Sequence, residues 1–125
     1  MIVDTNALSA AADDDPAIIA ILTRADQMAI PVVVLGEYRY GIAQSRQRAI
    51  YENWLASLLR DCAVLDINET TTQHYTEITL DLRHKSKPIP TNDLWIAALC
   101  RQHLLPLLSR DRHFDRVTGL KRIGW

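Results

Sequence analysis

Four acidic side chains stand where they could act together on a metal ion. Asp4 directly follows an apolar run, and Asp111 comes two residues after another such run ends. Glu37 lies one to two helical turns beyond a third apolar run, and Asp93 lies in the first turn of a predicted helix. In open parallel sheets, sites form beyond the carboxyl ends of the strands, where the strand order reverses. These carboxylates are therefore candidates for one shared site.

The chemistry of such a site would be that of a hard divalent cation. Four converging carboxylates repel one another, so the cluster needs cations to be tolerated at neutral pH. Oxygen ligands without His or Cys suit Mg²⁺ or Mn²⁺. Two such ions can activate a water and stabilise both oxygens of an in-line phosphoryl displacement. The sequence thus predicts metal-dependent hydrolysis of phosphodiester bonds.

Each acid also has a purely structural interpretation. Asp4 and Asp111 could cap the segments that follow them. Glu37 could be a solvated helix residue, and the helix dipole alone favours Asp93 in a first turn. Asp93 fits this interpretation least well, because its helix is apolar almost all round and a charge there needs partners.

Strand-like and helix-like segments alternate along the chain. The apolar runs predict strands over residues 1–4, 28–34, 62–67, 105–109 and, at an edge, 120–125. The helical pattern predicts helices over residues 13–26, 35–43, 46–61, 69–86 and 91–104, with a turn or short helix over 110–117. Strands that are near-continuous apolar runs are typical of a parallel sheet covered on both faces. The sequence therefore predicts an α/β fold.

Local signals indicate where several helices begin and end. Asp15 is a good N-cap before Pro16 at the first helical position. The acidic triplet 13–15 is therefore interpreted as a solvated helix start, since it lacks the alternating ligands of a calcium loop. Thr91 is expected to cap the buried helix, and Gly41 to end the helix after the second strand.

The composition restricts the classes of protein. The chain has 125 residues, of which 48% are hydrophobic, and a net charge of −1, so it lacks the basic footprint of many nucleic-acid binders. Cys62 and Cys100 stand apart in apolar runs and are expected to be free thiols in a reducing compartment. No secretion signal is recognisable, and no apolar run reaches the about 18 residues of a membrane span. We expect one soluble, cytoplasmic domain over residues 1–125 with no membrane contact.

Four sequence blocks follow one another along the chain: VDTNAL, LGEYRYGI, PIPTNDLWIAAL and LLSRDRHFDRV. In this order they resemble PIN-domain ribonucleases of the VapC toxin type, and the similarity covers essentially the whole chain. The resemblance implies a three-layer α/β/α sandwich around a central parallel sheet. It implies an Mg²⁺- or Mn²⁺-dependent endoribonuclease that is the toxin of a type II toxin–antitoxin system. Position by position, it implies catalytic and metal-binding roles for Asp4, Glu37, Asp93 and Asp111.

The resemblance also implies supporting residues and partners. Thr5, Asn6 and Ser109 match polar positions that would orient carboxylates or metal-bound waters. Ser109 stands where the family often has Thr, so the hydroxyl is retained. Asp115 matches a further acid sometimes found at the margin of the metal site, with an ordinary surface Asp as the alternative. The expected partners are an RNA substrate, a cognate antitoxin that inserts a segment into the active-site groove, and a second copy of the chain in a homodimer.

Basic residues flank two of the acids. Arg83, Lys85 and Lys87 precede the helix that carries the third acid, and Arg110 and Arg112 flank the fourth. Such side chains hold phosphates and position a strand without reading its sequence. We expect them to contact RNA, with a solvated helix end as the alternative for the first group.

Two other functions remain open. A non-catalytic module that binds RNA or a partner would keep the fold, although an absent acid would favour it and none is absent. A haloacid-dehalogenase-like phosphatase would use Asp4 as nucleophile, but Asn6 stands where that family needs a second Asp. His84 and His113 belong to the basic segments beside the acids but are not expected to be metal ligands or general bases, because a metal-activated water requires no His.

Overall fold

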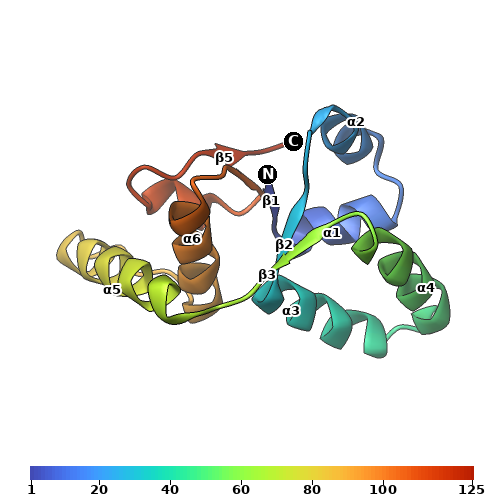
Figure 1. Cartoon of the computed structure of the whole chain (residues 1–125), viewed down its shortest axis with the longest axis horizontal. Helices are drawn as coiled ribbons and strands as arrows, with labels where there is room; N and C mark the ends of the chain where they lie inside the picture. The colour runs from blue at the N-terminus through green and yellow to red at the C-terminus, as the bar shows by residue number, and fades with distance from the viewer.

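A computed structural model describes all residues from 1 to 125 and contains five parallel strands with helices on both sides (Figure 1). The strands are β1 (Ile2–Val3), β2 (Ala29–Pro31), β3 (Ala63–Leu65), β4 (Leu107–Leu108) and β5 (Arg122–Ile123). Their order in the sheet is β3-β2-β1-β4-β5, and every neighbouring pair is parallel. The predicted α/β/α sandwich with a parallel sheet is confirmed.

The helices divide between the two sides of the sheet. They are α1 (Thr5–Ala12), α2 (Pro16–Arg24), α3 (Val32–Ala43), α4 (Arg48–Leu59), α5 (Glu69–His84), α6 (Thr91–His103) and the short 3-10 helix η1 (Arg112–Arg116). Figure 1 shows α1 to α4 on one side of the strands and α5 and α6 on the other. The chain runs outward from β1 to β2 and β3 and then returns to β4 beyond β1. The strand order therefore reverses between β1 and β4, which is where α/β sheets form their sites.

The core is built on the two central strands and on α6. The residues of β1 and β4 are fully buried, as the near-continuous apolar runs predict. Residues 96–100 of α6 are buried in succession, so this helix is the buried one that the sequence predicts. Trp95 lies half-buried on the same helix and stacks on Tyr75 of α5, with ring centroids 4.0 Å apart. This stacking holds α5 against α6.

The edge strands are less covered than the pattern predicts. In β3, Ala63 and Val64 are exposed, and both residues of β5 are only half-buried. An outer strand has a neighbour on one side only, so the helices packed on the centre of the sheet leave part of it open. None of the helices is both long and apolar enough to cross a membrane.

The predicted boundary between β2 and α3 is wrong. Residues 32–34 were expected in the strand, but they form the first turn of α3, with Pro31 at the N-cap. Val favours strands only weakly and in context, and here Val34 is fully buried as part of the helix. The C-terminal end of the predicted helix over residues 35–43 is confirmed: α3 ends at Ala43, two residues beyond Gly41, and Ile42 is still on its buried side.

Two helix starts also differ from expectation. Residues 5–12, for which no element is predicted, form α1, whose run of Ala residues favours a helix. Thr91 is the first residue of α6, and Pro90 occupies the N-cap without any side-chain hydrogen bond. Asp15 caps α2 as predicted, since its carboxylate accepts a hydrogen bond from Ala17 N.

The fold leads to a prediction about Phe114, which is fully buried and anchors η1 on the core. We expect Phe114→Ala to lower the free energy of unfolding by about 3 kcal/mol or more, through lost burial and an unfilled cavity. Urea denaturation measures this, with Tyr40→Ala as the control because Tyr40 is 72% exposed. Equal losses in the two variants would show that Phe114 does not anchor η1.

Candidate active site

Asp4 is held at the centre of the sheet edge by both its backbone and its carboxylate. Its N–H donates to Leu108 O of the neighbouring strand at 3.0 Å. Its Oδ1 accepts a hydrogen bond from Thr5 N at 2.8 Å as the N-cap of α1, and its Oδ2 accepts one from Ser109 Oγ at 2.6 Å. The Asp4 side chain is thus both the N-cap of α1 and a member of the acidic cluster. The structural and the functional interpretations of this residue are therefore compatible.

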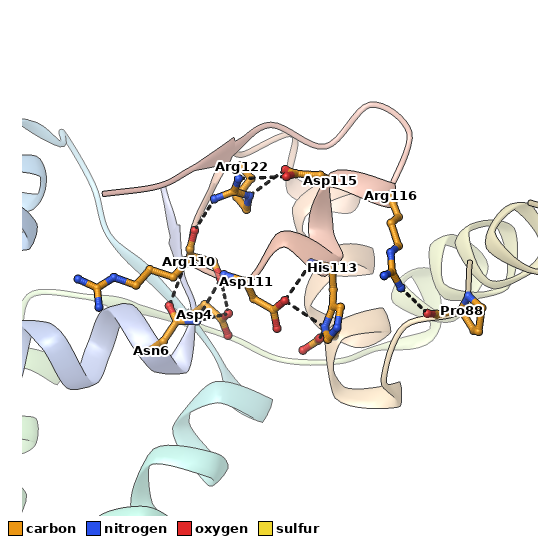
Figure 2. A network of polar contacts seen from close by, with 11 residues as sticks. Asp4, Asn6, Pro88, Arg110, Asp111, His113, Asp115, Arg116 and Arg122 are labelled. Atoms are coloured by element: carbon orange, nitrogen blue, oxygen red, sulfur yellow. Dashed lines mark hydrogen bonds and ion pairs between the residues drawn. The ribbon is translucent and has the colours of Figure 1, made fainter. Parts of the chain in front are cut away.

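Ser109 joins the carboxyl ends of β1 and β4. Its hydroxyl donates to Asp4 Oδ2 and accepts hydrogen bonds from Asp111 N at 3.0 Å and Asn6 Nδ2 at 3.3 Å. Asn6 also accepts a hydrogen bond from Arg110 N at 3.2 Å, so that both arms of its amide are used (Figure 2). Ser109 and Asn6 therefore fix the orientation of the first acid relative to the segment that carries Asp111.

The Asp111 side chain meets α6 through an imidazole. Asp111 Oδ1 caps η1 by accepting a hydrogen bond from His113 N at 2.9 Å. His113 Nδ1 lies 3.0 Å from Asp111 Oδ1 and 3.3 Å from Asp93 Oδ2. The possible ligand atoms of these three residues all lie within 4.8 Å of one another. The sequence does not predict His113 as a metal ligand or base, and its only signal is that it follows an acid by two residues in the same short turn.

Glu37 reaches the cluster from α3, where this helix contacts α6. Its pKa is raised, first by burial and then by the negative charges of Asp4 and Asp93. The side chains of Asn92 and Thr5 lie close enough to favour its charged form in part. Asp111 acts on Asp4 and Asp93, and these two act on Glu37, so the charges of the four predicted acids are linked although they come from four separate segments.

The electrostatics of the cluster are those of a site that favours a cation. Burial is the main cause that raises the pKa of Asp4, and the charge of Asp111 adds to it against the Ser109 hydrogen bond. Burial likewise raises the pKa of Asp93, while the interaction with His113 lowers it. The Thr5 hydroxyl is buried beside these acids, near enough to Glu37 to favour its charged form, yet it forms no well-aligned hydrogen bond. Carboxylate oxygens, an imidazole nitrogen and an orphaned hydroxyl together fit a divalent cation with its bound waters.

Asp115 does not join the other acids. Its two carboxylate oxygens accept hydrogen bonds from Arg122 Nε at 2.8 Å and from the second terminal nitrogen of Arg122 at 3.0 Å. Figure 2 shows this pair on the far side of the β4–η1 segment from Asp4. Arg122 also donates to Ser109 O at 3.1 Å. Asp115 therefore supports the backbone of Ser109 through Arg122 and faces away from the cluster.

Two arginines near the site make internal contacts. The guanidinium of Arg110 lies 4.5 Å from the ring centroid of Trp125, and one of its nitrogens lies 3.5 Å from Asp15 Oδ2. Arg116, for which no role is predicted, donates to Pro88 O at 3.0 Å (Figure 2). This bond ties η1 to the loop that leads into α6, and so it links the segments that carry the third and fourth acids.

The other basic residues differ in whether they form an internal ion pair. Lys85 forms an ion pair with Asp81 at 2.7 Å. Arg83, Lys87 and Arg112 are exposed and form no ion pair. These exposed side chains are available to an anionic partner, whereas Lys85 and Arg110 already have internal partners.

Comparisons with known proteins agree with this geometry. The sequence model of the PIN domain family matches residues 1–120. Ribonuclease VapC2 of Haemophilus influenzae is 31% identical over 106 residues, which cover 81% of this chain and 77% of the relative. Ribonuclease VapC5 of Mycobacterium tuberculosis is 28% identical over 96 residues, which cover 75% of this chain and 71% of the relative.

A solved structure extends the likeness to three dimensions. It is VapBC2 from Rickettsia felis bound to a DNA fragment from its promoter, and one of its chains superposes with a TM-score of 0.86 at 25% identity. The superposition covers 99% of this chain and 97% of the other. The family match, the sequence relatives and the shared fold lead to one conclusion: the chain belongs to the PIN domain family.

Proposed function

We propose that this protein is a metal-dependent endoribonuclease that hydrolyses RNA phosphodiester bonds as the toxin of a type II toxin–antitoxin system. One observation carries the proposal: four carboxylates from separate segments converge where the strand order reverses. Relatives named VapC ribonucleases support the same activity. Residues 1–125 act as one domain in this proposal, and the phosphatase alternative is not supported by membership of the PIN family.

The acidic residues have distinct tasks in this proposal. Asp4, Asp93 and Asp111 hold Mg²⁺ or Mn²⁺, and Ser109 and Asn6 keep the first of these carboxylates in orientation. When bound, the ion lowers the pKa of a coordinated water and stabilises negative charge on phosphate oxygens. Glu37, whose pKa is raised by burial and by the neighbouring acids, binds a proton more readily than an ordinary carboxylate and is suited to accept one from a bound water.

The proposal also assigns roles to the exposed basic residues near the site and names the expected partners. Arg83, Lys87 and Arg112 are exposed and contact RNA phosphates, which position a strand without reading its bases. Arg110 and Lys85 contribute only after releasing their internal partners. A cognate antitoxin covers the acidic cluster, and a second copy of the chain forms a homodimer. The similar solved structure is a VapBC2 structure, which supports an antitoxin as partner.

The first prediction concerns the acids themselves. Asp4→Asn and Asp93→Asn each remove a negative charge from the proposed metal site, so we expect RNA cleavage to fall about 100-fold or more. The assay uses purified, antitoxin-free protein on a mixture of structured RNAs with Mg²⁺, with Mn²⁺ or with EDTA. EDTA is expected to abolish the cuts made by the unchanged protein.

Glu77→Gln is the matched control for this assay, because Glu77 is a carboxylate on the exposed side of α5, 3.8 Å from Arg101. It is expected to leave cleavage unchanged. Circular dichroism shows whether each variant is folded. Full cleavage by folded Asp93→Asn would contradict the proposal, as would cuts that persist in EDTA.

A second prediction concerns Ser109, whose buried hydroxyl serves both Asp4 and Asp111. Ser109→Ala leaves the Asp4 carboxylate and Asp111 N without this partner, so we expect a loss of about 1–3 kcal/mol of stability and about 10–100-fold weaker metal binding. Ser109→Thr keeps the hydroxyl and is expected to retain metal binding. Calorimetric titration with Mn²⁺ and urea denaturation measure the two effects, and equal Mn²⁺ affinity in both variants would rule out this role.

A third prediction is a dependence of stability on pH. Asp93 has a raised pKa in the fold, so its carboxyl binds a proton more tightly in the folded than in the unfolded chain. Its contribution to stability is fully present below its ordinary pKa of about 4 and is lost as pH rises through the raised value. In EDTA, we therefore expect Asp93→Asn to be stabilised relative to the unchanged protein, and more so as pH rises.

The measurement is urea denaturation of both proteins at about pH 5 and about pH 7.5. The difference between the two proteins is the useful quantity, because Asp81 and Asp115 have lowered pKa values and act in the opposite direction. Saturating Mg²⁺ is expected to reverse the order of stability at the higher pH. If the difference in stability between the two proteins does not change with pH, the charge of Asp93 does not destabilise the fold.

A further inference from the structure

His113 presents a nitrogen to the same two carboxylates that the proposed function assigns to a metal ion. Its Nδ1 lies 3.0 Å from Asp111 Oδ1 and 3.3 Å from Asp93 Oδ2. In Figure 2 dashed lines join His113 to the Asp111 carboxylate. Nothing in the chemistry of an all-carboxylate site requires a nitrogen here, so the position of this ring needs its own explanation.

The spacing of these atoms is that of ligands on one ion. Two ligands at right angles, with metal–ligand bonds of about 2.1 Å, lie about 3 Å apart. The two nitrogen–oxygen distances match this separation, and the three possible ligand atoms all lie within 4.8 Å of one another. A cation at the centre of this triangle can therefore contact all three without a change of fold.

The backbone fixes the ring in this place. His113 N donates to Asp111 Oδ1 at 2.9 Å, which holds the residue in the first turn of η1. The next residue, Phe114, is fully buried and fastens the turn to the core. Asp93, the carboxylate across the site, is only 15% exposed, while the imidazole is 41% exposed. The imidazole is therefore held over a largely buried acid, yet open to an ion that arrives from solvent.

We propose that His113 binds the divalent ion through Nδ1 together with Asp93 and Asp111, and that this nitrogen gives the site a preference for first-row transition metal ions over Mg²⁺. Mg²⁺ strongly prefers oxygen ligands, whereas an imidazole nitrogen adds affinity for first-row transition metal ions in their usual order, least for Mn²⁺ and more for Co²⁺. The inference rests on the proposed function, since both place the ion among the same acids. It adds the choice of metal, which carboxylates alone do not set.

Calorimetric titration of the metal-free protein, without RNA, tests this inference with Mn²⁺, Co²⁺ and Mg²⁺ separately. We expect His113→Ala to weaken Co²⁺ binding by about tenfold or more and Mn²⁺ binding by a smaller factor of about threefold or more, and to weaken Mg²⁺ binding by less than about twofold. His103→Ala is the matched control, because His103 is exposed at the far end of α6. It is expected to change none of the three affinities.

A spectroscopic measurement separates a ligand from a residue that only orients the acids. Pulsed electron paramagnetic resonance of bound Mn²⁺ is expected to show coupling to a nitrogen nucleus, and His113→Ala is expected to abolish it. Absence of that coupling in the unchanged protein overturns the inference. So does an equal loss of affinity for all three ions in His113→Ala, which indicates an orienting role, or no loss at all.

Asp93→Asn distinguishes failure of this inference from failure of the proposed function. If Asp93→Asn abolishes binding of every ion while His113→Ala has no effect, only the nitrogen ligand is refuted. If Asp93→Asn binds all three ions as the unchanged protein does, or if the unchanged protein binds none of them, the inference and the proposed metal site fail together.

Discussion

The hydrogen bond from Ser109 Oγ to Asp4 Oδ2 joins residues 105 positions apart, and the site is organised around it. It exists only because β1 and β4 pair in parallel at the centre of the sheet, which brings their carboxyl ends to the same edge. The same hydroxyl accepts a hydrogen bond from Asp111 N. One buried side chain thereby sets the relative position of the first and fourth acids.

Burial of several acids close together lowers the stability of the folded chain. The carboxyl groups of Asp4, Glu37 and Asp93 all have raised pKa values, with burial as the leading cause in each case. A chain selected only for stability would not bury acids in this way, but functional sites commonly carry such strain. The buried central strands and α6 provide the stability that offsets it.

A second set of contacts supports the segment after β4. Arg122 connects Asp115 to the carbonyl of Ser109, and Arg116 connects η1 to the loop before α6. The buried side chain of Phe114 anchors η1 to the core. No hydrogen bond or ion pair joins the side chains of Arg116, Arg122 or Phe114 to the four carboxylates, yet these residues determine where Asp111 and His113 lie relative to Asp93. The geometry of the site therefore depends on contacts of residues that are not themselves members of the acidic cluster.

The sequence by itself determined the alternation of strands and helices, the parallel sheet and the candidate acids. It could do so because apolar runs, N-caps such as Asp15 and acids at strand ends are local signals. The start of α3 at Val32 was not predictable in this way, because the burial of Val34 against other elements outweighs the strand preference of Val. The pairing of Asp115 with Arg122 and the place of His113 between two acids were decided only by tertiary structure. Each is a contact between neighbours in space, and a side chain's partners follow from packing, which spacing along the chain does not encode.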